Sequence, residues 1–241
     1  GNLLGGAGGA CVVVCHPVEP VPSPTADRRT VASLWSGVAG LTLLMVVTTV
    51  DSLTRGDGYD LTRHWISLLQ HGARGWLGTL VFALSGVLVL ASVPGLRAVG
   101  ATMGGHGGSS TKTDRRDAAA LPVLVAALGS ALVVIAVIPT DPSMEYPVRT
   151  DTYVATSLGQ VHSIAGAVVL GALAASCWVI AALARTRPGT ARWVPTLARG
   201  TAAVMAAVFL LCSSAVVASD AGSWEAARAG AFQRVSLLLG G

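Results

Sequence analysis

Charged residues are scarce in this chain: they make up 12% of its 241 residues, about half the share usual in soluble domains. This scarcity excludes an ordinary soluble globular protein, which needs a polar surface. The apolar residues, 52% of the chain, occur in blocks of about 20, the length at which an α-helix crosses ~30 Å of hydrocarbon. We therefore predict a helical integral membrane protein, because a lone span must satisfy its backbone polar groups internally.

Cysteine is also rare, with four residues in the whole chain. Cys177 and Cys212 lie inside apolar runs, where cysteine behaves as a small hydrophobe. Cys11 and Cys15 lack the second pair that a structural zinc site would need. Neither a disulfide framework nor a zinc site is predicted.

Acidic residues are outnumbered, 12 Asp and Glu against 16 Lys and Arg, which gives a net charge of +4. A basic protein could bind nucleic acid. Here, however, the basic residues cluster in the connections between apolar blocks, as membrane orientation requires. We therefore expect the lipid bilayer as partner and no nucleic acid.

Five apolar segments are long enough to be complete spans, and a sixth begins at about residue 231 within "GAFQRVSLLLGG". The predicted fold class is all-α, a polytopic transmembrane bundle over residues 31–241 whose sixth span is truncated. Residues 1–30, rich in Gly and Pro, are expected to form a disordered tail. The five spans are expected at about 31–50, 76–96, 118–138, 159–183 and 200–219.

The distribution of basic residues predicts an orientation. About ten Lys and Arg precede the first span or follow the second and fourth, against about six in the other connections. The positive-inside rule then places the N-terminus in the cytoplasm of a multi-pass protein of the cell membrane.

The predicted outer side carries most of the polar chemistry. We expect a polar pocket there whose binding residues are His64, Asp141, His162 and Arg234. Trp65 and the apolar residues after it favour a short amphipathic helix at the interface, with Trp76 as a second interfacial anchor. The outer residues singled out are His64, Ser67, His71, Asp141, Glu145, Arg149, His162, Asp220, Glu225 and Arg234.

Two of these residues stand at span boundaries. Asp141 lies between Pro139 and Pro142, which stop the helix before it. His162 opens the fourth span, where a polar side chain normally faces the bundle or a wet cavity. Each also has a simpler interpretation: Asp141 as a helix boundary and His162 as a packing or hydrogen-bonding residue.

The fourth span also carries a small-residue stripe with a period of four, which predicts a close helix–helix contact. Its members are Ser163, Ala167, Gly171 and Ala175.

These features together resemble DUF998, a bacterial and archaeal family of six-span membrane proteins of unknown function. The resemblance covers about residues 31–241 and implies a fold and a functional face, without an activity. It would carry over His64, Ser67, Asp141, His162 and Arg234 as family positions. The chain departs from the family at Gln70-His71, where a Ser-x-Leu-Gly type turn is usual, and in its short sixth span. The matching motifs are "RHWISLLQHGARGW", "VIPTDP", "LGQVHSIAG" and "GAFQRVSLL".

Two classes of function fit these residues. A non-enzymatic protein would bind a lipid, a small molecule or a partner, and its outer residues would form a hydrogen-bonded cap over the helix ends. A membrane hydrolase or lipid-modifying enzyme would use Ser67 as nucleophile, His162 as base and Asp141 as orienting group.

Three further possibilities have less support from the residues. His64, Asp141 and His162 are weak candidates for metal ligands, and no metal site is assigned. Haem binding needs two inward histidines at matching depth, and only His162 lies clearly within a span. Transport would predict inverted repeats and paired broken helices, which the spans lack. The residues specify no cofactor.

Overall fold

The computed structural model describes residues 27–105, 112–142, 146–147, 156–186, 189–218 and 229–240. Within these ranges the chain is a bundle of α-helices, as predicted. Of the predicted tail, residues 1–26 lie outside the described residues. The helices are α1 (Arg28–Thr54), η1 (a short 3-10 helix, Ile66–Gln70), α2 (Gly75–Gly105), α3 (Lys112–Val137), α4 (Ser157–Thr186), α5 (Trp193–Ala218) and α6 (Ala229–Gly240).

Five helices are long and apolar enough to cross a membrane, and each overlaps one of the five predicted spans. Each helix begins before the predicted first residue of its span. α6 begins at Ala229, close to the predicted 231, and its 12 residues extend about 18 Å. The five long segments are Arg28–Thr54, Gly75–Thr102, Arg116–Val137, Ser157–Arg185 and Trp193–Leu210.

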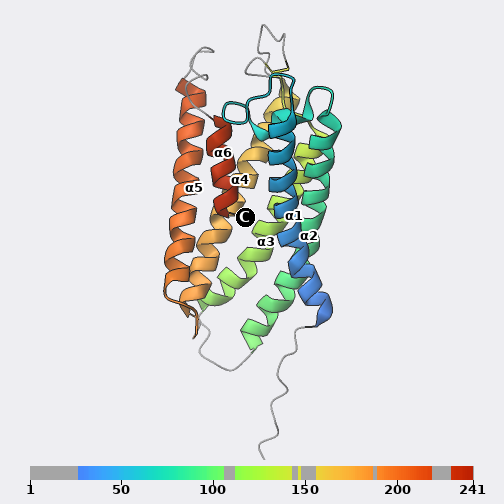
Figure 1. Cartoon of the computed structure of the whole chain (residues 1–241). Helices are drawn as coiled ribbons and strands as arrows, with labels where there is room; N and C mark the ends of the chain where they lie inside the picture. Colours follow the sequence, from blue (N-terminus) through green and yellow to red (C-terminus); the bar gives the residue numbers. More distant parts are fainter. Residues whose placement is uncertain are drawn as a thin grey trace, which may run out of the picture.

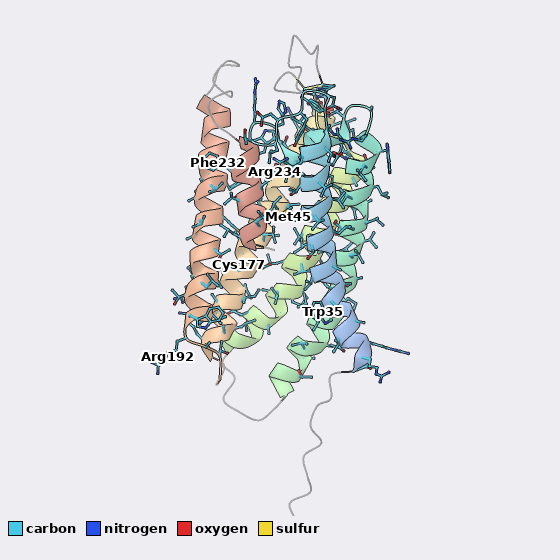
Figure 2. All side chains as sticks on the ribbon, in the orientation of Figure 1. Trp35, Met45, Cys177, Arg192, Phe232 and Arg234 are labelled. Atoms are coloured by element: carbon cyan, nitrogen blue, oxygen red, sulfur yellow. The ribbon has the colours of Figure 1, made fainter. Side chains whose placement is uncertain are left out.

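The five long helices pack in chain order, each against the next, and α6 lies between α5 and α1 and also touches α4 (Figure 1). Nitrogen and oxygen atoms gather at the end that holds Arg234 (Figure 2). We call this the cap end; it comprises residues 55–74, 138–142, 146–147 and 229–234. The opposite end, where α4 turns into α5 near Arg192, is the turn end.

Proline interrupts two of the long helices, Pro94 in α2 and Pro122 in α3. Near Pro94 a side chain of α1 forms hydrogen bonds with backbone groups of α2. Ser33 Oγ donates to Ala91 O at 2.6 Å and accepts from Gly95 N at 2.9 Å, bridging a carbonyl and an amide that a regular helix would join directly. This hydroxyl ties α1 to the part of α2 that contains Pro94.

The closest helix contacts are made at glycines. A Cβ on Gly86 of α2 would lie 2.8 Å from Gly129 O of α3, and one on Gly129 would lie 2.9 Å from Gly86 O. Likewise, a Cβ on Gly40 of α1 would lie 2.9 Å from Ser85 O of α2. Small residues let backbones approach in this way, and dispersion contacts then stabilise the packed helices.

The predicted contact along the small-residue stripe of α4 is wrong within this chain. Ser163 and Gly171 are exposed, and a Cβ on Gly171 would have nothing within 4 Å. α4 packs instead through another face, which includes Ala165, Val169 and Leu173. Residue size alone does not show which side of a helix faces a neighbour.

The predicted interfacial helix exists but is buried. In η1, Ile66, Leu68 and Leu69 belong to the hydrophobic core, so this segment folds into the bundle. Gly75 and Gly78 in the first turn of α2 make room, since a Cβ on Gly78 would lie 2.8 Å from Leu69 O. The segment therefore closes the cap end.

We predict that Gly86→Ala lowers the free energy of unfolding by about 1–3 kcal/mol, because the added methyl group forces α2 and α3 apart. Gly171→Ala is the matched control: it adds the same group on an open surface and should be neutral or slightly stabilising. Thermal unfolding of the purified protein in detergent measures both. Equal effects of the two substitutions would contradict the packing described.

Candidate functional site

The end of α3 exposes backbone carbonyls that the helix backbone itself cannot satisfy. Pro139 has no N–H for Ile135 O, and Pro142 has none for Ile138 O, four residues earlier in each case. Gln70 Nε2 donates to Ile135 O at 2.9 Å. Thus a side chain of η1 supplies a hydrogen bond that the backbone of α3 cannot make.

His162 does the same for the second carbonyl. It is buried, with 4% of its surface exposed, and its Nδ1 lies 2.6 Å from Ile138 O. A carbonyl oxygen only accepts, so Nδ1 carries the proton in this bond. His71 Nε2 likewise donates to Thr140 O at 2.7 Å. Both histidines therefore tie the connection after α3 to neighbouring elements.

Asp141 caps the start of α4. Its carboxylate accepts from Thr156 N at 2.9 Å and from Thr156 Oγ1 at 2.7 Å. Thr156 Oγ1 in turn accepts from Gly159 N at 3.0 Å, as a helix N-cap does. The carboxylate packs so closely on Gly159 that a side chain there would overlap it. The interpretation of Asp141 as a helix-boundary residue fits this geometry.

Arg234 of α6 gathers oxygen atoms from the α1–α2 connection. It is 7% exposed, and its Nη1 donates to Leu61 O at 2.6 Å and to His64 O at 3.2 Å. Its Nη2 donates to Ser52 Oγ at 2.9 Å and to Tyr59 Oη at 2.7 Å. Among the described residues its partners are thus carbonyl and hydroxyl oxygens, which makes Arg234 a clamp on its own chain.

The turn that Arg234 holds is organised by Asp60 and His64. Asp60 Oδ1 accepts from Thr62 N at 2.7 Å and Thr62 Oγ1 at 2.8 Å, and these bonds hold the pKa of Asp60 below its usual value. His64 Nδ1 accepts from Asp60 N at 2.8 Å, so this nitrogen is unprotonated. Two side chains thereby fix the backbone of residues 60–64.

The first turn of α6 completes the clamp. Ala231 N donates to Thr62 O at 3.0 Å and Gly230 N donates to Arg63 O at 3.3 Å. Four consecutive carbonyls, those of residues 61–64, therefore point at the positive N-terminal end of α6 and its arginine. A Cβ at Gly230 would overlap this array, which explains why glycine occupies the position.

A second arginine clamps η1 to α1. Arg55 pairs with Asp51, four residues earlier, at 2.7 Å, and both side chains are almost fully buried. Arg55 also donates to Leu69 O at 2.9 Å and His71 O at 2.6 Å, the carbonyls near the end of η1. Arg74 Nε lies 3.4 Å from the other oxygen of Asp51, a charge contact without hydrogen-bond geometry. Asp51 lies near the C-terminal end of α1, where the helix dipole disfavours a negative charge. Arg55 and Arg74 compensate for it.

Three aromatic rings connect the two clamps. Tyr59, His64 and Tyr146 lie with ring centroids 5.2 to 5.4 Å apart. Tyr59 Oη accepts from Arg234, and Tyr146 Oη accepts from Arg55 at 2.8 Å and donates to Asp57 at 2.8 Å. Burial raises the pKa of both tyrosines above the usual value, so both stay neutral at physiological pH.

The residues singled out from the sequence thus fall into two groups. His64 and Arg234 meet in the clamp on the α1–α2 connection, whereas Asp141 and His162 organise the passage from α3 to α4. Ser67 is half-buried in η1. Within the described ranges no three His, Cys, Asp or Glu side chains, the set His64, Asp141 and His162 included, form a group that could hold a metal ion. Glu145, Arg149, Asp220 and Glu225 lie outside the described residues.

Sequence reasoning missed Asp51, Arg55, Tyr59, Tyr146 and Gln70. One signal was present for the first two, because an Asp and an Arg four residues apart share a helix face. Asp51 ends an apolar run, however, and resembles an ordinary span boundary. Nothing local distinguishes the two tyrosines or Gln70, whose partners come from distant segments.

Comparison with known proteins fits this architecture. The family model described as "Protein of unknown function (DUF998)" matches residues 38–241, which include all the described helices except the first turns of α1. The chain belongs to the DUF998 family. With five helices able to cross a bilayer, this DUF998 protein is an integral, multi-pass membrane protein. No curated protein and no solved structure matched the chain.

We predict that Asp51→Leu and Arg55→Met each lower the free energy of unfolding by about 3–5 kcal/mol, because each leaves a buried charge without its closest partner. The double variant should lose less free energy of unfolding than the sum of the two single losses, since both partners are removed together. Asp60→Asn is the control: it keeps the accepting oxygen of an exposed residue and should change stability by less than about 1 kcal/mol. Strict additivity in a double-mutant cycle would contradict the pairing.

Proposed function

We propose that this DUF998 protein is a non-catalytic membrane protein that uses its cap end, on the extracytoplasmic side, to bind a lipid, a small molecule or a partner. One observation carries the proposal: His64, Asp141, His162 and Arg234, the four predicted binding residues, are all hydrogen-bonded to the protein's own backbone. Arg55, Arg234, Gln70, His71 and His162 all donate to carbonyl oxygens. Side chains used in this way hold the local backbone in a fixed shape.

A rigid cap suits recognition. Buried charges are costly at the edge of a membrane, so two buried arginines that hold one connection indicate that its shape matters. A surface held in its binding conformation loses less entropy when it binds, and loops on a rigid scaffold commonly carry function. The exposed polar residues Asp57, Asp60 and Thr62 lie on the part so held. The excess of basic residues at the turn end supports the orientation.

The hydrolase alternative has less support. A triad needs the acid to hold the base and the base to reach the nucleophile. Here Asp141 accepts from Thr156 and His162 donates to Ile138 O. The carboxylate and imidazole are therefore engaged with different partners.

Native mass spectrometry of the protein extracted from its own membrane tests the proposal. We expect the wild type to retain a co-purifying molecule and Arg234→Gln to lose most of it, because loss of the guanidinium releases the α1–α2 connection. Gly171→Ala, on an open face of α4, is the control and should retain the molecule. Equal retention in all three proteins, or none in the wild type, would contradict binding at the cap.

A serine-directed probe separates the two classes of function. A fluorophosphonate reacts covalently with activated serine hydroxyls. We expect no labelling of Ser67, so that wild type and Ser67→Ala behave alike. Labelling that disappears in both Ser67→Ala and His162→Ala would show a working nucleophile and base, and would favour the hydrolase.

A further inference from the structure

The turn end of α4 and α5 carries positive charge with no acid in its own segment. Residues 157–218, which include both helices and their connection, contain no Asp or Glu. Their arginines all fall toward the turn end: Arg185, Arg187, Arg192 and Arg199. The other basic segments differ, because Asp27 precedes Arg28, and Asp114 and Asp117 accompany the arginines near the start of α3.

One of these arginines is held in place by an aromatic ring. The guanidinium of Arg199, on α5, lies 5.8 Å from the ring centroid of Trp178, on α4. A cation over an indole face is attracted by the ring quadrupole, and the contact joins the two helices. Trp178 lies about two turns before the end of α4. The charge of Arg199 is therefore held closer to the membrane interior than the end of that helix.

Exposed apolar side chains lie on the same two helices as the held charge. Trp178, Trp193 and Leu197 are 57%, 65% and 59% exposed, as expected of groups that face acyl chains and the interface. Arg192 is exposed directly before α5 and points away from the bundle at the turn end (Figure 2). The first turn of α5 has no acidic residue, so the positive end of its dipole adds to the same charge. One held cation and one exposed cation thus lie on helices that carry lipid-facing apolar side chains.

We propose that this surface, formed by Trp178, Arg192, Trp193, Leu197 and Arg199, binds the headgroup of an anionic phospholipid. The arginines would donate to the phosphate, and the acyl chains would lie along Leu197 and the indole rings. This inference concerns the turn end and is independent of the function proposed for the cap end. Phosphate alone would not suffice, because the exposed apolar side chains need acyl chains beside them.

The test compares lipids retained in native mass spectra of the full chain, purified in detergent with equal amounts of phosphatidylglycerol and phosphatidylcholine. We expect the wild type to prefer phosphatidylglycerol and Arg192→Gln/Arg199→Gln to lose that preference by at least about tenfold. The control, Arg97→Gln/Arg116→Gln, removes two exposed charges of the same end from α2 and α3 and should keep the preference.

Two further measurements complete the test. Trp178→Leu should weaken retention while leaving every arginine in place, because the platform under Arg199 is lost; this variant decides the question if the double variant does not fold. Added inorganic phosphate should not displace the lipid. The proposal is overturned if the wild type retains both lipids equally, if the control loses as much as the double variant, or if phosphate competes.

Discussion

A backbone carbonyl that has no donor is the constraint that organises the cap end. In a medium without water each such group costs free energy, and proline, helix ends and tight turns create several of them close together here. Gln70 and His162 satisfy carbonyls at the end of α3, Arg55 those near the end of η1, and Arg234 those of the turn at residues 61–64. The polar residues of this apolar protein occupy the places where the helices leave oxygen atoms unpaired.

Because of this constraint, Arg55 and Arg234 have a different role from most charged residues in membrane proteins. A guanidinium offers five donors in a planar fork, so one side chain can reach carbonyls of several segments at once. Arg55 also neutralises Asp51, whereas Arg234 is surrounded by carbonyls and hydroxyls among the described residues. The tyrosine and histidine rings between them fill the space that both clamps enclose. Shape and charge at this end are therefore set together, as the proposed recognition surface would require.

Hydropathy was sufficient to predict the helices, because span length is fixed by the bilayer. It could not orient them: the stripe on α4 faces outward, while the contacts form at Gly40, Gly86 and Gly129, which lie in no obvious motif. The predicted polar residues that the structure describes lie at one end. The roles of His71, His162 and Arg234 could not be predicted, because each donates to a carbonyl of another segment. The position of Pro139 relative to Ile135 does reveal one unpaired oxygen from sequence alone; the donor, Gln70, comes from another element.

The carbonyl array at residues 61–64 has a consequence for biosynthesis. Arg234 follows Leu61 by 173 positions, so the ribosome completes the α1–α2 connection long before its donors exist. At roughly 5–20 residues per second, that interval is about 9–35 seconds. During it these oxygen atoms lack the donors of α6 and need another partner, such as water. The cap therefore closes only after α6 has been synthesised.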